Sequence, residues 1–292
     1  MSAGVFRGSL AGGWMGDPQE TWLARAPGGR VAGWYQLELP DLENRDRAML
    51  ELVVDPGLRR QGFGRDLLGH ALDRAAGHGR SAVSGFAWRD SAGSAFARAA
   101  GADRGLVSIR SVQDLPVSVP PVATPADYTL ESWYGPMPEK VLADVAALYD
   151  TLADAPHRDG EAPSRWDAAR VRERLNGVVI RLGLRNHAIA ARHDASGELA
   201  ALTMVGLDPG QPAWGMQELT AVTRPHRGHR LGLVVKLAML DLLASAEPQL
   251  EHIVTNNAEA NDHMIAVNQA LGYRIVGPPY EWWQLAGSWA QS

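Results

Sequence analysis

The sequence contains no cysteine, which excludes disulfide bridges, a thiolate nucleophile and a thiolate-based zinc site. No apolar run approaches the ~18 residues that a membrane-spanning helix needs. Positive charge is not in excess either: the formal net charge is −5, which argues against binding to nucleic acid. The histidines show no metal-ligand spacing, so no metal is expected. These absences predict a cytoplasmic protein that acts without nucleic acid, membrane or metal.

Lysine is almost absent. Lys140 and Lys236 are the only lysines among 28 basic residues, which leaves 26 arginines (28 − 2). Such a bias is more typical of a GC-rich genome than of a function. The remaining composition, 46% hydrophobic and 21% charged, is that of a globular protein, and 292 residues suffice for two domains.

A proline-rich segment divides the chain. Leu115–Pro125 reads LPVSVPPVATP, and because proline fixes φ and lacks an N–H group, this segment is predicted to be a stiff linker. We therefore expect an N-terminal domain over residues 1–115, a linker over 116–125 and a C-terminal domain over 126–292.

The two halves of the chain resemble each other. Leu50–Ala75 and Glu218–Ala244 each read as a short apolar strand, a turn with proline and glycine, and an apolar helix. Aligning Arg59 with Arg227 keeps a single offset of 168 residues through both segments. The chain is therefore predicted to be a divergent tandem repeat.

Each half also contains a predicted hairpin, over Glu20–Leu39 and over His187–Leu207. Only the second half places two helix-like segments before its hairpin, at Pro138–Leu152 and Arg165–Leu175. The polar segment Asp154–Ser164 lies between them and is interpreted as a lid over a substrate or as an ordinary loop.

One turn in each half has the chemistry of a phosphate site. After Val54 and after Val222, glycines and arginines open a helix, so backbone N–H groups and positive charge converge at its N-terminus. The spacing fits neither a Walker loop nor a dinucleotide fingerprint. The residues expected to bind phosphate are Arg59, Arg60, Gln61, Gly62, Gly64 and Arg65 in the first half, and Arg227, Gly228, His229, Arg230 and Gly232 in the second.

This pattern, Arg-x-x-Gly-x-Gly after a Val-Val-Asp-Pro strand, resembles the acyl-CoA signature of the GNAT superfamily of N-acyltransferases. The second turn resembles the same element, with Arg230 where glycine is commoner. Downstream, Asn257 and Asn261 resemble the family's second CoA-contacting strand and helix, and Trp282–Gln284 its closing strand. The resemblance covers essentially the whole chain as two copies, as in tandem members such as mycothiol synthase.

The resemblance implies an α/β (α+β, mixed-sheet) fold of two GNAT-like domains in tandem. Each would have a central, mostly antiparallel sheet with splayed strands, flanked by helices. Acyl-CoA would lie in the gap between the splayed strands, with its pantetheine arm on the backbone at Val54 or Val222. Acetyl-CoA is the expected donor because it is the commonest one in the family. An amine would then attack the thioester directly, without a metal or a covalent enzyme intermediate.

Direct transfer needs a base for the amine and a partner for the departing thiolate. Many family members use a tyrosine as that partner, and the resemblance places Asn268 at this position and Ala97 at its equivalent in the first half. Glu218, at the start of the second splayed strand, is the candidate base, with an exposed strand-start glutamate as the alternative. Its counterpart in the first half is Leu50.

The resemblance also implies that the two front helices form much of the acceptor pocket, and only the second half has them, at Pro138–Leu152 and Arg165–Leu175. Catalysis is therefore assigned to the second half, and the first half is left to bind CoA without turnover or to support the fold. We expect an N-acyltransferase that acts on a small-molecule amine, as a monomer or homodimer. Two alternatives remain open. The acyl group could arrive on the pantetheine arm of an acyl carrier protein, or the chain could be a non-catalytic CoA-binding or regulatory module.

Overall fold

The computed structural model describes the chain except residues 14–15, 155–157, 159 and 288–292, and it divides into two compact units. Unit 1 comprises Met1–Ser9, Ile109–His157 and Pro163–Gly277, and unit 2 comprises Leu10–Ser108, Arg158–Ala162 and Pro278–Ser292. Both units pack helices on a mixed sheet, which confirms the predicted mixed α/β fold class.

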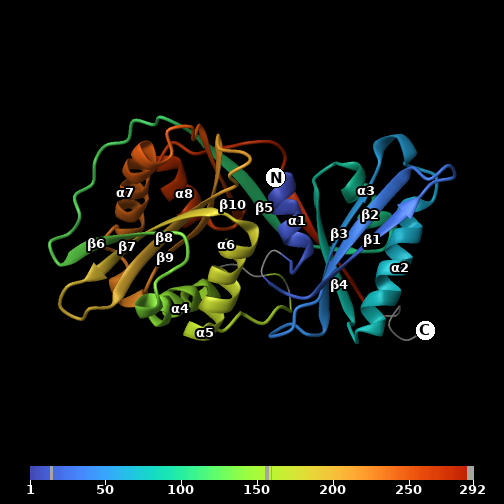
Figure 1. The fold of residues 1–292 in the computed structure, drawn as a ribbon, viewed down its shortest axis with the longest axis horizontal. Helices are drawn as coiled ribbons and strands as arrows, with labels where there is room; N and C mark the ends of the chain where they lie inside the picture. The colour runs from blue at the N-terminus through green and yellow to red at the C-terminus, as the bar shows by residue number, and fades with distance from the viewer. Residues whose placement is uncertain (14–15, 155–157, 159, 288–292) are drawn as a thin grey trace. The chain divides into compact units, whose positions relative to one another are not determined.

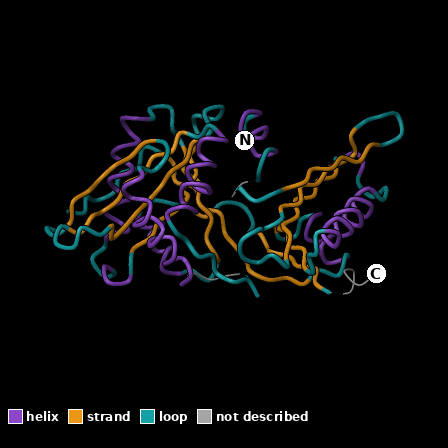
Figure 2. Tube along the Cα trace, turned by 60° about the horizontal axis from the view of Figure 1, so that its bottom comes forward, coloured by secondary structure: helices purple, strands orange, loops and turns teal. Residues whose placement is uncertain are grey.

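The sheet of unit 2 begins with the predicted hairpin and continues in the order β1-β2-β3-β4-β12-β5. On it packs α2, whose Leu67, Ala71 and Ala75 recur at helical spacing and contact Tyr35 and Leu37 of the sheet. Figures 1 and 2 show α2 running beside these strands. The elements are β1 (Gln19–Arg25), β2 (Val31–Glu38), β3 (Arg47–Val54), η1 (Pro56–Leu58), α2 (Phe63–Gly77), β4 (Ala82–Trp88), α3 (Ala92–Ala99), the first part of β5 (Asp103–Asp114) and β12 (Tyr280–Ala286).

The C-terminal strand belongs to the sheet of unit 2, which corrects its expected place as the closing strand of the second half. β12 runs antiparallel to both β4 and the first part of β5, with Trp283 opposite Gly85 and Arg104. Its Glu281 is buried and pairs with Arg89 at 2.9 Å between Oε1 and Nε. The proline-rich segment has no helix or strand and lies in unit 1. The compact units are therefore not the contiguous stretches 1–115 and 126–292.

The sheet of unit 1 has the order β5-β10-β9-β8-β7-β6, with the short β11 on β5. Its central β8 is buried along its whole length because helices cover both faces of the sheet. The strands are β6 (Tyr128–Tyr134), β7 (Arg185–His193), β8 (Leu199–Leu207), β9 (Trp214–Val222), β10 (His252–Ala258), β11 (Arg274–Ile275) and the second part of β5.

Two hydrophobic clusters hold the helices of unit 1 on its sheet. On one face, α7 (Leu231–Ala246) packs Val235 and Met239 against β8, and on the other α4 (Leu142–Asp150) packs Leu148 against it. Figure 1 shows α7 and α4 on opposite sides of the strands. The two predicted front helices are thus present. The remaining helices are α1 (Ala3–Leu10), η2 (Glu139–Val141), η3 (Thr151–Asp154), α5 (Ala168–Arg170), the π-helix η4 (Val171–Asn176), α6 (Gly177–Leu182), η5 (Arg224–His226) and α8 (Asp262–Ala270).

Each sheet contains one pair of parallel strands that separate partway along. β3 and β4 pair from Arg47 to Met49, and the described pairing then stops, although β3 continues to Val54. In the same way, β9 and β10 pair only up to Met216 and Val254. We call these places the first and second strand divergence. At each one, the backbone of the longer strand is left without a strand partner on that side in the described pairings.

Among the described residues, no helix combines the length and the apolar character that crossing a bilayer requires.

Candidate active site

Two turns, one after each diverging strand, have the same backbone conformation. We call residues 59–65 and 227–233 the first and second glycine turns. In the first, Arg60 and Gly62 are left-handed, with φ of 64° and 96°. In the second, Gly228 and Arg230 are left-handed, with φ of 89° and 60°. Glycine and arginine have exchanged places while the backbone shape is kept, although a left-handed arginine costs about 1–2 kcal/mol.

An arginine holds each turn to the strand before it. Arg59 donates from Nε to the carbonyl of Val54 at 3.4 Å, and Arg227 donates to that of Val222 at 3.3 Å. α2 and α7 begin within these turns, and no described side chain caps either N-terminus. Their first N–H groups can therefore serve an anion. The residues predicted to bind phosphate form one group at the start of α2 and another at the start of α7. In both groups the arginines are exposed, as are Gln61 and His229.

The histidine that precedes the second turn faces the protein interior. His226 is buried, and its Nδ1 shares a hydrogen bond with the Tyr128 hydroxyl at 2.9 Å. The ring of His193 lies 4.8 Å from that of His226. His226 therefore packs the turn against the sheet, whereas His229 stays on the exposed side of the turn.

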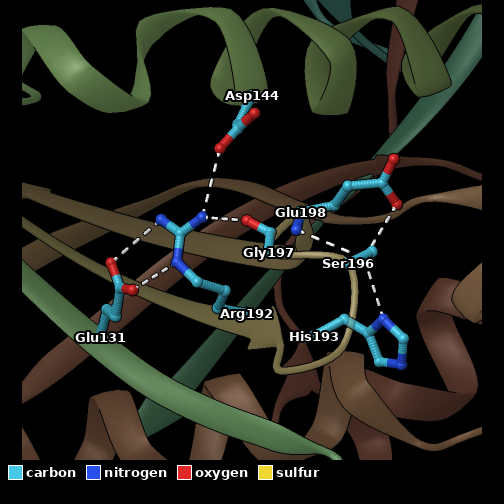
Figure 3. Close-up of polar contacts among 7 residues, drawn as sticks. All are labelled: Glu131, Asp144, Arg192, His193, Ser196, Gly197 and Glu198. Atoms are coloured by element: carbon cyan, nitrogen blue, oxygen red, sulfur yellow. Dashed lines mark hydrogen bonds and ion pairs between the residues drawn. The ribbon is translucent and has the colours of Figure 1, made fainter.

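Charged side chains at the end of the β7–β8 hairpin fix α4 over the sheet. Figure 3 shows Arg192 reaching Glu131 on β6, Asp144 on α4 and the carbonyl of Gly197. Beside it, His193 contacts the Ser196 hydroxyl. This network joins α4, through Asp144, to the β6 and β7 strands of the sheet.

Glu218 lies on an irregularity of β9. Val222 pairs with Ala201 of β8, but past Thr203 the register shifts by one, so β9 carries an extra residue around Glu218 and Leu219. The buried Gln217 supports this bulge by donating to the carbonyl of Met204 at 2.7 Å. The matching strand pair of unit 2 keeps one register throughout. Bulges redirect side chains and are frequent beside active sites.

The carboxyl group of Glu218 lies on the face of the sheet that α4 covers. A Cβ atom added to Gly206 on β8 would lie 3.5 Å from Glu218 Oε1. Burial raises the pKa of Tyr149 on α4, and the nearby charge of Glu218 raises it further. The Glu218 side chain is exposed to solvent, as in the alternative of an exposed strand-start glutamate, but the atoms packed around its carboxyl group raise its pKa to about 7. A carboxyl group with this pKa is suited to accept a proton near neutral pH.

Asn268, the other predicted catalytic residue, is part of a buried polar chain. Its Oδ1 accepts a hydrogen bond from Lys236 Nζ at 2.9 Å, and its Nδ2 donates to Asn257 Oδ1 at 2.9 Å. Asn268 and Lys236 are both buried, whereas Asn257 is partly exposed. The predicted Asn257 and Asn268 are therefore in direct contact. Asn261 lies at the N-cap of α8, where its side chain accepts from the Met264 N–H at 3.2 Å.

Lys236 is the residue of this cluster that the sequence analysis did not single out. Its Nζ lies 5.0 Å from the centre of the Tyr273 ring, and burial lowers its pKa to about 7. A signal was available, since Lys236 stands in an apolar helix of a chain with only one other lysine. The period of α7 also puts it beside residues of the buried face.

Five polar residues around the second divergence correspond to apolar residues in unit 2. Residues of β3 and α2 correspond to residues of β9 and α7 that lie 168 positions later in the sequence. Residues of β4 and of the end of α3 correspond to residues of β10 and of the end of α8 that lie 171 positions later. The carbonyls of Ala97 and Asn268 support the second offset, because each accepts from the N–H group five residues further on. Glu218, Lys236, Asn257, Asn268 and Tyr273 thus correspond to Leu50, Leu68, Phe86, Ala97 and Ala102.

All five of those apolar residues line one pocket at the first divergence. Trp283 and Leu285 of β12 complete this pocket. The two divergences therefore differ in chemistry. The second divergence, in unit 1, carries a carboxyl group, an amine and two amides. At the corresponding positions, the first divergence, in unit 2, carries hydrocarbon side chains.

The predicted lid falls partly outside the described residues, at 155–157 and 159. Of the remainder, Arg158 and residues 160–162 belong to unit 2, where the guanidinium of Arg158 lies 4.2 Å from the centre of the Trp282 ring. Asn44 also holds the backbone of Ala162, with 2.8 Å between its Oδ1 and the Ala162 nitrogen. In the part of the chain that is described, no three His, Asp or Glu side chains group closely enough to hold a metal ion.

Comparison with known proteins identifies relatives of both halves. Residues 7–98 match the model of a family described as the acetyltransferase (GNAT) family. A solved structure described as a tandem GNAT protein from the clavulanic acid biosynthesis pathway is 31% identical, with a TM-score of 0.84 over 99% of this chain and 89% of that one. No curated protein matches.

Two more distant structures share the fold. A GCN5-related N-acetyltransferase from Sphaerobacter thermophilus is 16% identical, with a TM-score of 0.65 over 91% of this chain and 80% of that one. Another, from Kribbella flavida, is also 16% identical, with a TM-score of 0.55 over 99% of this chain and 97% of that one. At this level of identity, the likeness concerns the fold alone.

Proposed function

The chain belongs to the GNAT acetyltransferase family as a tandem member, and on that premise we propose that it is an acyl-CoA-dependent N-acyltransferase whose second half is catalytic. Acyl transfer is the activity that the family and fold support in general. The proposal adds the donor, acetyl-CoA, the acceptor, a small-molecule amine, and the half of the chain that performs the reaction.

One observation carries the choice of half. Residues at corresponding positions of the two divergences are polar in unit 1 and apolar in unit 2. Glu218 and Asn268 provide a proton acceptor and a hydrogen-bond donor, whereas Leu50 and Ala97 can do neither. The first divergence keeps its glycine turn, so unit 2 is proposed to bind an acyl-CoA or to support the fold without turnover.

The second glycine turn is proposed to hold the pyrophosphate of the donor. The first N–H groups of α7 and the exposed Arg227 and Arg230 supply hydrogen bonds and positive charge there. From this point β9 runs back from Val222 past Glu218 to Gln217, and along this stretch its backbone has no described pairing on the β10 side. A pantetheine arm that hydrogen-bonds to this backbone would bring its thioester between Glu218 and Asn268.

Glu218 is proposed to accept the proton that the amine loses as it attacks. Its raised pKa, about 7, places it among groups that exchange protons near neutral pH. A cationic acceptor is also attracted by the carboxylate; it first loses one proton to water, so that the neutral amine attacks and Glu218 accepts the second proton. Asn268 Nδ2, fixed by its neighbours, offers a hydrogen bond to the sulfur as the carbon–sulfur bond breaks.

The acceptor is proposed to bind on the α4 face of the sheet, beside Glu218. Two aromatic residues lie there: Tyr149 on α4 and Trp166, with their ring centres 4.4 Å apart. Aromatic rings at a binding site contribute apolar area and attract ammonium groups. The tandem relative from clavulanic acid biosynthesis supports a small molecule of specialised metabolism as the acceptor.

Matched substitutions in the two glycine turns test this proposal. Gly64 and Gly232 are equivalent, neither has a positive φ, and an added Cβ would meet only ordinary contacts, at 3.4 Å and 3.6 Å. An aspartate at either position would repel a pyrophosphate from the helix start. We expect Gly232→Asp to raise the KM for acetyl-CoA at least about tenfold in an amine-acetylation assay, and Gly64→Asp to change turnover less than twofold.

Loss of turnover in Gly64→Asp alone would contradict the assignment. Acyl-CoA binding by calorimetry without transfer to any amine of a broad panel would support the non-catalytic alternative instead. Comparing free acetyl-CoA with a carrier-bound acetyl group tests the donor, because a carrier-bound group brings no nucleotide to the arginines. A faster reaction with the carrier-bound donor would contradict the proposal.

A further inference from the structure

We propose that Lys236 is a positioning residue for the departing thiolate: it fixes the Asn268 amide and places a positive charge behind it. This inference rests on the proposed function of the second divergence and extends it to a residue that holds no part of the donor or acceptor. Three observations on the contacts of this lysine carry it.

First, the hydrogen bond from Lys236 decides which way the Asn268 amide faces. An ammonium group can only donate, so the oxygen of Asn268 must point to it, at 2.9 Å. The NH2 group is then directed to the other side, where one hydrogen is bound by Asn257 Oδ1 at 2.9 Å. The second hydrogen remains for the sulfur. With the amide reversed, its oxygen would face the thiolate and repel it.

Second, the amine of Lys236 has no carboxylate partner in its described contacts. It touches Asn268 Oδ1 and lies over the face of Tyr273, whose own pKa is raised by burial, so the phenol stays neutral. A buried cation without a counter-ion destabilises the fold, and such groups are characteristic of functional sites. The other charged or titratable residues on the elements around it are Glu218 on β9, His252 on β10, Arg185, His187, Arg192 and His193 on β7, Asp241 on α7, and Asp262 and His263 on α8.

Third, the corresponding residue of unit 2 is Leu68, in the apolar pocket with Ala97. The lysine thus accompanies the asparagine at one divergence, and both are replaced by hydrocarbon at the other. Leu68 shows that a leucine is sufficient for packing at this position of the helix, so the lysine of α7 is not needed for packing alone.

In the reaction, the amine nitrogen forms its bond to the acyl carbon and gives a proton to Glu218. The carbon–sulfur bond breaks, and its electron pair stays on sulfur as the thiolate. The Asn268 N–H, polarised by the ammonium group behind it, stabilises this negative charge. Water then protonates the thiolate. Only the ammonium form of Lys236 supplies the charge, so kcat should fall as pH rises through the pKa of the lysine, about 7.

The test compares Lys236→Met, which removes the donor and the charge, with Lys236→Gln, which keeps a donor. For Lys236→Met we expect kcat to fall roughly tenfold to a hundredfold, the KM for acetyl-CoA to stay within twofold, and the alkaline fall in kcat to disappear. Lys236→Gln should recover part of kcat but not the alkaline fall. The control is Lys140→Met, which removes the chain's other, exposed lysine and should change neither.

Stability separates this role from a structural one. Because Lys236 is a buried unpaired cation, both variants should resist denaturant at least as well as the native chain at pH 7. Native-like kcat in Lys236→Met, or reduced kcat with the alkaline fall intact, would overturn the inference. The proposed function would still stand if Gly232→Asp raised the KM, so the two failures are distinguishable.

Discussion

Gly62 and Arg230 occupy the same place in the two glycine turns and share a left-handed backbone, with φ of 96° and 60°. Each is the N-cap of the helix that follows. The turn therefore has a required shape that an arginine adopts at some cost in stability. The charge at Arg230 offers a reason to accept that cost, since it lies where the donor's phosphates are proposed to bind.

Arg230→Gly should stabilise unit 1 and weaken donor binding together. Relief of the left-handed arginine gains about 1–2 kcal/mol, and the added freedom of glycine in the unfolded chain offsets about 0.4–1 kcal/mol. We expect the free energy of unfolding to rise by about 0.5–1 kcal/mol and the affinity for acetyl-CoA to fall severalfold. Denaturant titration and calorimetry measure the two effects.

Arg227→Gly is the control for this prediction. Arg227 has φ of −69°, so glycine there relieves nothing and should lower stability. An equal gain in stability from both variants would show that strain at Arg230 is not the cause.

Glu218→Gln should change both stability and activity with pH. The pKa of this carboxyl group is raised from 4.5 to about 7. A group whose pKa is higher in the folded state stabilises the fold at low pH, and that contribution is lost as pH rises through the folded pKa. The variant should therefore match the native chain at pH 4.5 and be the more stable of the two above pH 7.

The same substitution should remove the base of the reaction. In the native chain, kcat/KM should rise with pH as Glu218 ionises and fall again as Lys236 loses its proton, so that the two pKa values of about 7 predict a bell-shaped profile. In Glu218→Gln this rise should disappear and kcat should be reduced about a hundredfold or more. An unchanged pH profile with the same amine would show that another group accepts the proton.

Gly206→Leu should block the acceptor and leave the donor bound. An added Cβ would lie 3.5 Å from Glu218 Oε1 and 3.8 Å from Asn186 Oδ1, which are ordinary contacts. Gly206→Ala should thus keep most of its activity, whereas the branched side chain of leucine would crowd the carboxyl group. Turnover should fall at least about tenfold in the leucine variant, with acetyl-CoA affinity unchanged by calorimetry. Equal turnover in both variants would place the acceptor elsewhere.

A chain that ends at Gly277 should lose the fold of unit 2. It lacks β12, which pairs with both β4 and β5 and places Glu281 beside Arg89. Without this strand, the backbone groups of both neighbours lose their partners. Hydrogen exchange of the β4 amides measures the effect. Glu281→Gln should show a smaller loss of about 1–3 kcal/mol. Full protection of β4 in the truncated chain would contradict the role of β12.

The sequence predicted the features that depend on local patterns. The hairpins follow from their glycine turns and alternating apolar residues, and the two glycine turns follow from the arginines and glycines after Val54 and Val222. The predicted equivalence of Ala97 and Asn268 also agrees with the structure, because both residues occupy the same place in the turns that end α3 and α8. These features need only residues that are close along the chain.

The features that were missed depend on distant partners. β12 reads as a strand from its sequence, but its neighbours in the sheet are fixed by contacts with Trp88 and Ser108, far away in the chain. The hydrogen bond of Lys236 joins two helices, and the inward position of His226 depends on Tyr128. Hydrophobic periodicity gives the exposure of a residue on its own element, and it does not identify the side chain that approaches from another.

The central claim is that the second divergence holds the reacting thioester. A crystal structure with a non-hydrolysable acetyl-CoA analogue, in which a methylene group separates sulfur from the acetyl carbonyl, tests it most directly. The account predicts the sulfur within about 4 Å of Asn268 Nδ2, the carbonyl beside Glu218 and the pyrophosphate on the second glycine turn. An analogue bound only in unit 2, with its sulfur against Ala97, would contradict the account.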